Sequence, residues 1–447
     1  MKKNYLLGMA LMASLSFNSC DKEVVYVQDG TGVESVADGA QIITLQVENG
    51  GDGLATRAGR PLYSAEAKQT IENMKLWICD GAGNVIKYVK EISDWNTDDV
   101  STVYTTGGHG RQTTIELKDA DKLAAGTYKI YAVGYSNSSA YTLTDVTNVA
   151  KESTFNENMV LPCSTVGEEI FAGQMELTVE KGKGFKKPVV LNRQVAGAFA
   201  YVKDIPFMEG AKYLKLVASA QNQSLVLGNF NSFDLTGNGS GNANVKYVVN
   251  GTNGKSGSET YVISTIDLNK WFTAIKDDNG DNLIDAGENW KNPCRPSSSP
   301  AAGTYPTFQK GSAFGGEFVI PFAHVDGKQT LTLQLTNAGG KVLRSWKVNL
   351  GSTDEQLKQT ITCWNSGSTD WSTSLSGELA NTYSLVRNHL YGIGTRMNDE
   401  ANPEKPGVDP DPNPENPNDK PESLNNKQEL VLKVNDNWEV IHGMELD

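Results

Sequence analysis

Short stretches in which apolar and polar residues alternate recur along almost the whole 447-residue chain. A period of two is the pattern of a β-strand with one buried face. In the stretch 41–48, Ile43, Leu45 and Val47 alternate with polar residues, and a Gly-rich cluster follows. The pattern predicts an all-β protein with one short helix at 268–275. Strands are expected at 41–48, 74–79, 85–90, 112–117, 127–135, 169–179, 188–201, 213–218, 224–227, 260–266, 316–320, 330–335, 342–350 and 383–395.

The same alternation returns in the stretch 427–447, after a segment of a different kind. The preceding residues 401–426 are rich in Pro, Asp and Asn, a composition that cannot form a packed core. We expect an extended spacer there that could reach about 60 Å. The large apolar residues of the last stretch are Leu430, Leu432, Val434 and Trp438.

A strand held this far from its own domain is not stable alone and must pair with a sheet. The length of the spacer favours a sheet of another molecule, which would make 427–447 a donor strand with Trp438 as a candidate anchor. Two alternatives stay open from the residues alone. The tail could fold back onto its own domain, or it could stay unstructured until an unrelated partner binds.

The N-terminal residues indicate export. Lys2 and Lys3 precede an apolar run at 5–15 that is too short to span a membrane. The run ends in a small residue followed by Cys20, which resembles a lipoprotein signal with Cys20 as the lipidated residue. The alternative is an ordinary secretory peptide with a chance cysteine. No other stretch is apolar enough to cross a bilayer, so we expect membrane attachment only through the lipid of the precursor.

A Gly-rich loop at 49–60 follows the first predicted strand and contains Arg57 and Arg60. Exposed loops of small residues are the usual sites of proteolytic cleavage. The simpler interpretation is a surface loop in which arginine adds solubility, and the local composition alone favours it.

Charge and composition narrow the function classes. The formal net charge of −13, with no basic run to offset it, argues against a nucleic-acid partner. The four histidines are scattered, and no nucleophile, base and acid stand out together, so we do not expect an enzyme. Eight Trp and sixteen Tyr could form platforms for sugar rings, so a surface glycan-binding lipoprotein remains an alternative. The last four cysteines permit disulfides in an oxidising compartment without specifying a pairing: Cys79, Cys163, Cys294 and Cys363.

The segment 277–288 has the spacing of a calcium-binding loop. Calcium prefers several oxygen ligands, and this spacing wraps oxygens around one point. Asn282 replaces the usual Gly, but Asn tolerates a left-handed backbone better than most residues. We therefore expect a structural calcium ion, the alternative being an acidic surface loop without an ion. The predicted ligands are Asp277, Asn279, Asp281, Asp285 and Glu288.

In their order along the chain, these features resemble the fimbrillin family of pilins, which form type V pili. The spacer and terminal strand are most similar to the subgroup that contains the major subunit of short fimbriae. The resemblance covers nearly the whole chain, and the calcium-type loop is not part of it. Its motifs are the leader ending at Cys20, Thr56-Arg57-Ala58, Ile170-Phe171-Ala172-Gly173, Leu191-Asn192-Arg193-Gln194-Val195-Ala196-Gly197 and Leu385-Val386-Arg387-Asn388-His389-Leu390-Tyr391.

The resemblance implies two tandem transthyretin-like β-sandwich domains with an extended C-terminal donor strand. It implies a lipoprotein signal peptide at 1–20, a propeptide with the first strand at 21–57, an N-terminal domain at 58–206, a C-terminal domain at 207–400, a spacer at 401–426 and the donor strand at 427–447.

The resemblance also implies a function. The precursor would be anchored at the outer membrane, and an arginine-specific protease would cut between Arg57 and Ala58. The donor strand of another copy would then replace the strand at 41–48, and head-to-tail repetition would build a surface fimbrium with roles in adhesion and biofilm formation. Other fimbrial subunits would be further partners, and an accessory or tip subunit is the alternative within the family.

Overall fold

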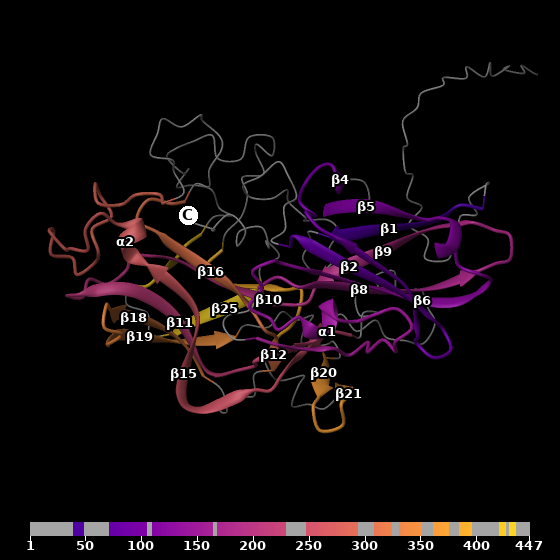
Figure 1. Cartoon of the computed structure of the whole chain (residues 1–447). Coiled ribbons are helices and arrows are strands. Elements are labelled where there is room, and N and C mark those ends of the chain that lie inside the picture. The colour runs from indigo at the N-terminus through magenta and orange to yellow at the C-terminus, as the bar shows by residue number, and fades with distance from the viewer. Residues whose placement is uncertain are drawn as a thin grey trace, which may run out of the picture. The chain divides into compact units, whose positions relative to one another are not determined.

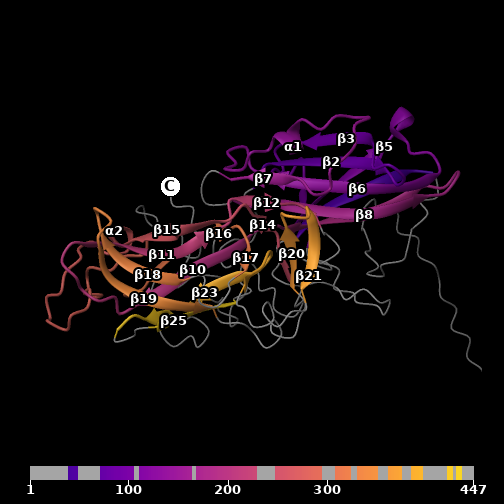
Figure 2. The same ribbon diagram turned by 90° about the horizontal axis from the view of Figure 1, so that it is seen from below.

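The computed structural model describes residues 39–48, 71–104, 110–163, 168–228, 247–293, 308–323, 330–350, 361–374, 384–395, 420–425 and 429–434. All of them belong to one unit, Val33–Asp447. The fold is all-β and consists of several sheets (Figures 1 and 2). Within the described residues, the helices are short: α1 (Thr144–Thr147), α2 (Leu268–Trp271) and a 3-10 turn (Asp119–Asp121). The helix expected at 268–275 is therefore a single turn.

The first sheet has the strand order β3-β2-β6-β8-β9-β1-β5-β4. Strands β8 and β9 pair only at Phe171–Arg193 and Ala172–Asn192, so the sheet bends there into two layers. Apolar side chains of β9-β1-β5 share one core with those of β2-β6-β8. The strands are β1 (Gln41–Glu48), β2 (Asn73–Asp80), β3 (Ile86–Ile92), β4 (Thr102–Tyr104), β5 (Gly110–Leu117), β6 (Gly126–Tyr135), β8 (Phe171–Val179) and β9 (Phe185–Arg193).

The second sheet has the order β15-β11-β18-β19-β25-β23-β10-β16, and Figure 2 labels these strands. Strand β24 pairs with β10. The core of the second sheet includes Phe199, Leu214 and Leu333, and the same cluster continues onto the first sheet through Trp77 and Tyr131. The strands are β10 (Ala196–Lys203), β11 (Ala211–Gln221), β15 (Lys255–Asp267), β16 (Ala313–Val319), β18 (Leu331–Asn337), β19 (Val342–Leu350), β23 (Leu390–Ile393), β24 (Glu422–Ser423) and β25 (Glu429–Val434).

Three small sheets complete the described structure, with the orders β14-β12-β7, β13-β20-β21 and β17-β22. The alternation pattern did not predict the β20–β21 hairpin, although its residues pair in a regular antiparallel register. The strands are β7 (Val160–Pro162), β12 (Ser224–Val226), β13 (Tyr247–Val249), β14 (Gly251–Thr252), β17 (Phe322–Ala323), β20 (Ile361–Asn365), β21 (Asp370–Ser374) and β22 (Ser384–Leu385).

The chain passes from the first sheet to the second between Arg193 and Ala196, ahead of the boundary expected at residue 206. The expected strand at 188–201 is two strands, β9 and β10, which belong to different sheets. Gln194 and Val195 separate them, and both are buried. A period of two continues unchanged across such a break, so the sequence pattern cannot locate it.

Candidate functional site

Strand β1 fills a gap between β5 and β9 that we call the first slot. It runs antiparallel to β5, from the pair Gln41–Leu117 to the pair Glu48–Gly110. It runs parallel to β9, from Gln41–Phe185 to Val47–Leu191. The predicted strand at 41–48 is thus confirmed, and both of its edges are hydrogen-bonded.

The inward face of β1 is fully buried. Ile43, Leu45 and Val47 are all 0% exposed and pack in the core of the first sheet. Burying a side chain of this kind stabilises a protein by about 1.5–3 kcal/mol, so the three together contribute about 5–9 kcal/mol. In the strand order, β1 alone joins β9 to β5. Removing it would leave two unpaired strand edges about 9.5 Å apart above an apolar pocket.

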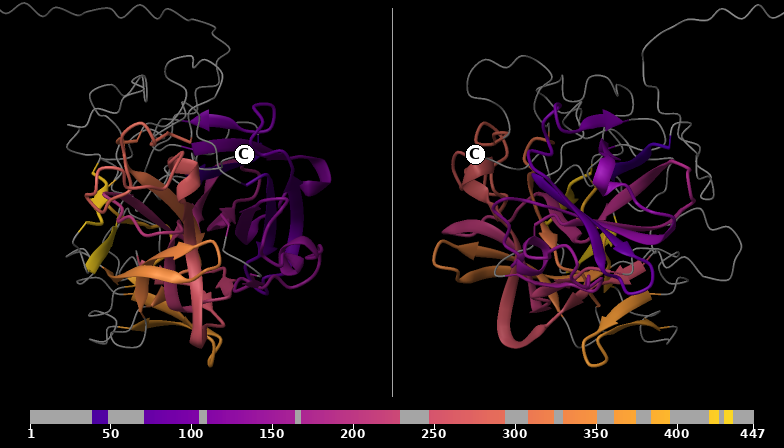
Figure 3. Two further views of the ribbon diagram at one scale, coloured as in Figure 1. Left: turned by 90° about the vertical axis from the view of Figure 1, so that its left-hand side faces the viewer. Right: turned by 45° about the vertical axis from the view of Figure 1, so that its right-hand side comes forward.

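Strand β25, the predicted donor strand, lies between β19 and β23 in the strand order, at a place that we call the second slot. Its residues are drawn in yellow in Figure 3. It is parallel to β19, from the pair Lys347–Glu429 to the pair Leu350–Leu432. It is antiparallel to β23 through the pair Tyr391–Val434. Of the alternatives that the sequence left open, this structure has the tail folded back onto its own chain.

The burial of β25 alternates as expected for a strand with one inward face. Leu430 is 2% exposed and Leu432 is 0% exposed, whereas Val431 between them is 41% exposed. The two leucines lie in the core of the second sheet. The expected anchor Trp438 lies outside the described residues, as do Cys20, Arg57 and Ala58.

The tail has a second attachment that the sequence analysis missed. Strand β24 pairs with β10, and the amide of the fully buried Leu424 donates to the Lys203 carbonyl at 2.9 Å. Gly394 has a φ of +78°, and a Cβ there would clash with the Tyr201 carbonyl oxygen. The apolar Leu424 within a polar spacer was the available signal for this attachment.

The two slots have neighbours of the same directions but differ in extent. Strand β1 pairs with both neighbours along nearly its whole length, whereas in β25 residues 429–432 pair with β19 and residues 433–434 pair with β23. Each holds a strand with one parallel and one antiparallel neighbour, and in each case apolar residues at alternate positions point into a core. A strand that replaced β1 in the first slot would need apolar residues at alternate positions. Strand β25 has this pattern.

The motifs that carry the family resemblance meet where the chain changes sheets. The Gln194 amide donates to the Ile170 carbonyl at 2.7 Å, and the Asn388 amide donates to the Val195 carbonyl at 2.9 Å. The buried Arg387 guanidinium donates to the Gln194 side chain at 3.0 Å and to the Gly228 carbonyl at 2.8 Å. Burial lowers the pKa of Arg387 to about 9, so it stays charged at neutral pH. This polar network links the two large sheets.

A buried ion pair lies beside this network. Arg193 Nε and Nη2 lie 2.7 and 2.6 Å from Glu169 Oε1, and both side chains are 0% exposed. The guanidinium also lies 4.9 Å from the centre of the Phe171 ring. Losing one member of such a pair leaves a buried charge without its counterion.

We therefore expect the substitution Glu169→Gln to lower the free energy of unfolding by about 3–5 kcal/mol. Urea denaturation followed by tryptophan fluorescence would measure the change. Glu176→Gln is the matched control, because Glu176 lies on β8, which begins two residues after Glu169, but is exposed. Equal denaturation midpoints for the two variants would contradict the expected role of the pair.

The predicted calcium loop is closed by its own hydrogen bonds. The Asp277 carboxylate accepts from the amides of Gly280 at 2.8 Å and Asn282 at 2.9 Å. Asn282 has a φ of +64°, the left-handed conformation expected there. Asp285 accepts from the Asp278 amide at 2.9 Å. The ligand types suit calcium, but no group of three or more His, Cys, Asp or Glu side chains among the described residues is placed to hold a metal ion.

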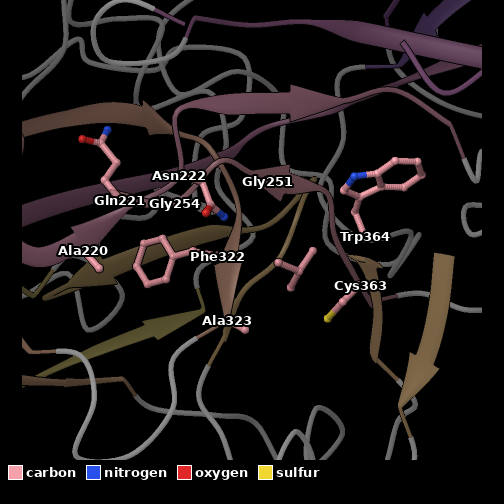
Figure 4. Close-up of a pocket in the computed structure, with 10 residues that line it drawn as sticks. Ala220, Gln221, Asn222, Gly251, Gly254, Phe322, Ala323, Cys363 and Trp364 are labelled. Atoms are coloured by element: carbon pink, nitrogen blue, oxygen red, sulfur yellow. The ribbon is translucent and has the colours of Figure 1, made fainter. Parts of the chain in front are cut away.

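A cavity of about 330 Å³ opens beside the β20–β21 hairpin (Figure 4). Across the hairpin, Trp364 and Trp371 meet edge to face with ring centres 5.3 Å apart. Burial raises the pKa of the Cys363 thiol to about 11, so the thiol stays protonated at neutral pH and is a poor nucleophile. The lining residues are Ala220, Gln221, Asn222, Val249, Gly251, Gly254, Phe322, Ala323, Cys363 and Trp364.

Two further observations concern the cysteines and the helices. Cys79 and Cys363 are free thiols in the described part of the chain, and Cys294 lies outside it. No helix in the described ranges has the length and apolar character needed to cross a bilayer.

Comparison with known proteins gives structural similarity at low sequence identity. No family model matches the chain, and no curated protein of similar sequence was found. A fimbrial assembly protein from Parabacteroides distasonis is 12% identical with a TM-score of 0.34, over 80% of this chain and 92% of its own.

Two proteins from Porphyromonas gingivalis are similar at a comparable level. The tip fimbrial protein Mfa3 is 10% identical with a TM-score of 0.35, over 80% of this chain and 96% of its own. The fimbrial anchor protein Mfa2 is 10% identical with a TM-score of 0.32, over 75% of this chain and 95% of its own. Identities and TM-scores this low do not assign a function to this chain.

Proposed function

We propose that this chain is a structural subunit of a cell-surface fimbrium that polymerises by donor-strand exchange. The precursor is exported as a lipoprotein lipidated at Cys20 and anchored at the outer membrane. Cleavage after Arg57 activates it. The observation that supports the proposal is that β1 and β25 each have one parallel and one antiparallel neighbour and share the same apolar spacing.

Cleavage between Arg57 and Ala58 separates β1 from the rest of the chain. All strands that hold β1 follow the cleavage site in sequence, so the cut leaves β1 bound only by non-covalent contacts. Before the cut, the covalent link keeps β1 at an effective concentration of about a millimolar or more near its slot. After the cut, β1 can dissociate and is diluted. An intact precursor therefore cannot accept a donor, which prevents assembly before export.

The β25 strand of another copy then enters the first slot by strand addition. To do so, the strand leaves the second slot of its own chain. The burial of its leucines and its backbone hydrogen bonds in the second slot are thus replaced by similar contacts in the first slot. The loss of the tethered competitor β1 shifts the balance towards exchange. Because each copy donates to the next and the contact does not close on itself, the product is a filament.

We align the two apolar patterns in the register that matches all three apolar positions. Leu430, Leu432 and Val434 take the positions of Ile43, Leu45 and Val47, which puts Val431 in the position of Thr44 and opposite Thr114 of β5. A slip by two residues would keep the same face inward but change this pair.

We expect filaments of a Val431→Cys, Thr114→Cys variant to be linked between subunits by a short thiol cross-linker, because directly opposed Cβ atoms lie about 5 Å apart. Denaturing gels would show a ladder of covalent oligomers. Pairing Val431→Cys with Gln112→Cys or Glu116→Cys tests the two slipped registers, and each single variant controls for the native thiols. A stronger ladder from either slipped pair would overturn the register, and no ladder from any pair would count against exchange at the first slot.

Partners follow from this mechanism. They are further copies of the chain, other fimbrial subunits and an arginine-specific protease, and the assembled fimbrium serves in adhesion and biofilm formation. A tip subunit accepts a strand but has no need to donate one, so the apolar pattern of β25 favours a stalk subunit. The cavity beside Trp364 is the observation that favours the other candidate, a surface glycan-binding lipoprotein.

We also propose that the loop at 277–288 binds a structural calcium ion. Binding requires the Asp277 carboxylate to turn from the amides of Gly280 and Asn282 towards the ion. In calorimetry, Asp277→Ala and Glu288→Ala should abolish the heat of calcium binding. Asp278→Ala is the matched control, because Asp278 is at a non-ligand position and its side chain pairs with Lys276. Binding that is unchanged in the first two variants would rule the site out.

A further inference from the structure

Emptying the first slot leaves strand β5 without a partner in the rest of the sheet. Its neighbours are β1 and β4, and β4 is the last strand of the sheet order and only three residues long. Once β1 has gone, β4 and β5 form a two-stranded ribbon, which by itself is marginally stable. Ile115 and Leu117 still pack in the core.

The slot also has a way to close. Because β1 is antiparallel to β5 and parallel to β9, strands β5 and β9 are antiparallel to each other. Two antiparallel edges with unpaired amides and carbonyls can pair directly, and buried unpaired groups are unfavourable. A slot that receives a donor must therefore resist the movement of β5 by about one strand spacing, roughly 5 Å.

We infer that Arg111 holds the β5 wall of the first slot in position while the slot is empty, an inference that rests on the proposed function. The Arg111 side chain on β5 is only 1% exposed. Its Nε donates to Ser101 Oγ at 2.7 Å, and its Nη2 donates to the Ser101 carbonyl at 2.7 Å. Nη2 also lies 2.8 Å from Asp98 Oδ1, but the Asp98 side chain is 89% exposed, so water screens that contact.

The contacts of Ser101 continue into the opposite layer. Its hydroxyl donates to the Trp95 carbonyl. Trp95 is 0% exposed, belongs to the core of the first sheet, and donates its amide to the Glu72 carbonyl at 2.8 Å, next to the start of β2. This chain of contacts joins β5 to the β2 layer without involving any atom of β1. It therefore persists when β1 leaves.

Arginine is suited to this position because its planar fork can donate to two acceptors at once, whereas a lysine ammonium is a point charge on a flexible stem. The effect of Arg111 depends on the state of the chain. With β1 in place, hydrogen bonds from Gln41 to Glu48 also hold β5. With β1 absent, Arg111 supplies the polar attachment of β5 to the rest of the domain.

The test compares wild type, Arg111→Gln and Arg111→Lys, with Lys118→Gln as a matched control because Lys118 is at the end of β5 and its side chain is 66% exposed. The full chain is cut with an arginine-specific protease in the presence of a fluorescent peptide of residues 429–447. Anisotropy reports capture of the peptide. We expect Arg111→Gln to bind it at least tenfold more weakly than wild type, Arg111→Lys to fall between, and Lys118→Gln to match wild type.

Hydrogen exchange separates this inference from the proposed function. In the uncut chain, β5 amides should be equally protected in wild type and in Arg111→Gln. In the cut chain, they should lose protection, or gain a new pattern through pairing with β9, only in Arg111→Gln. If cut wild type retains β5 protection but captures no peptide, the proposed function fails while the role of Arg111 stands. Equal protection and equal capture in wild type and Arg111→Gln would overturn the inference, and so would an uncut Arg111→Gln chain that is already unprotected at β5.

Discussion

A chain with Arg57→Ala should remain a full-length monomer after treatment with an arginine-specific protease, while the wild-type chain is cut and forms filaments. The physical reason is the burial of β1. Releasing Ile43, Leu45 and Val47 from the core costs about 5–9 kcal/mol, and each 1.4 kcal/mol is a factor of ten. In an uncut chain, the state with an open first slot is therefore populated at most about a thousandth as much as the state with β1 in place. Mass spectrometry would follow cleavage, and electron microscopy would count filaments.

Arg60 provides the control for this experiment. Arg60→Ala keeps the Arg57–Ala58 bond and should be cut and polymerise like wild type. If Arg57→Ala is cut after Arg60 instead, the double variant is the decisive one. Filaments from an uncut double variant at the wild-type rate would refute the requirement for β1 release. Cut wild-type protein that stays monomeric would favour the glycan-binding alternative.

Removing the end of the tail from Leu424 onwards should abolish filament formation and also destabilise the monomer. Strand β25 joins β19 to β23, so the second sheet loses its connecting strand. Leu430 and Leu432 are buried. Replacing either leucine by alanine would already lower the free energy of unfolding by about 2–5 kcal/mol. The loss of filaments and the loss of stability then need to be separated.

Donor and acceptor roles allow that separation. After cleavage, the shortened chain should still capture a peptide of residues 429–447 in its first slot, because that slot is intact. Mixed with wild-type subunits, it should shorten filaments, since it accepts a strand but donates none. Val431→Ala is the point control for stability, because Val431 is 41% exposed and its truncation should leave the free energy of unfolding nearly unchanged. Normal filaments from the shortened chain alone would exclude β25 as the donor.

Much of the local structure follows directly from the residues. Alternating side chains at 41–48 predicted a strand that the structure has at Gln41–Glu48, and Leu430 and Leu432 share the inward face that their spacing indicated. The left-handed backbone at Asn282 also agrees with the sequence interpretation. Each of these properties depends on neighbours within a few positions, which a sequence records.

Only the tertiary structure decided which strands become neighbours. The alternation at 188–201 gives no sign that β9 and β10 belong to different sheets, and nothing in 429–434 says that the strand lies between β19 and β23 of its own chain. The contacts of Arg111 with Ser101 also depend on this arrangement. A period of two specifies which face of a strand is buried but not its partner, because partners are selected by packing between distant segments. The sequence by itself therefore determined many of the strands and their inward faces, and the fold decided that β1 and β25 each lie between one parallel and one antiparallel neighbour.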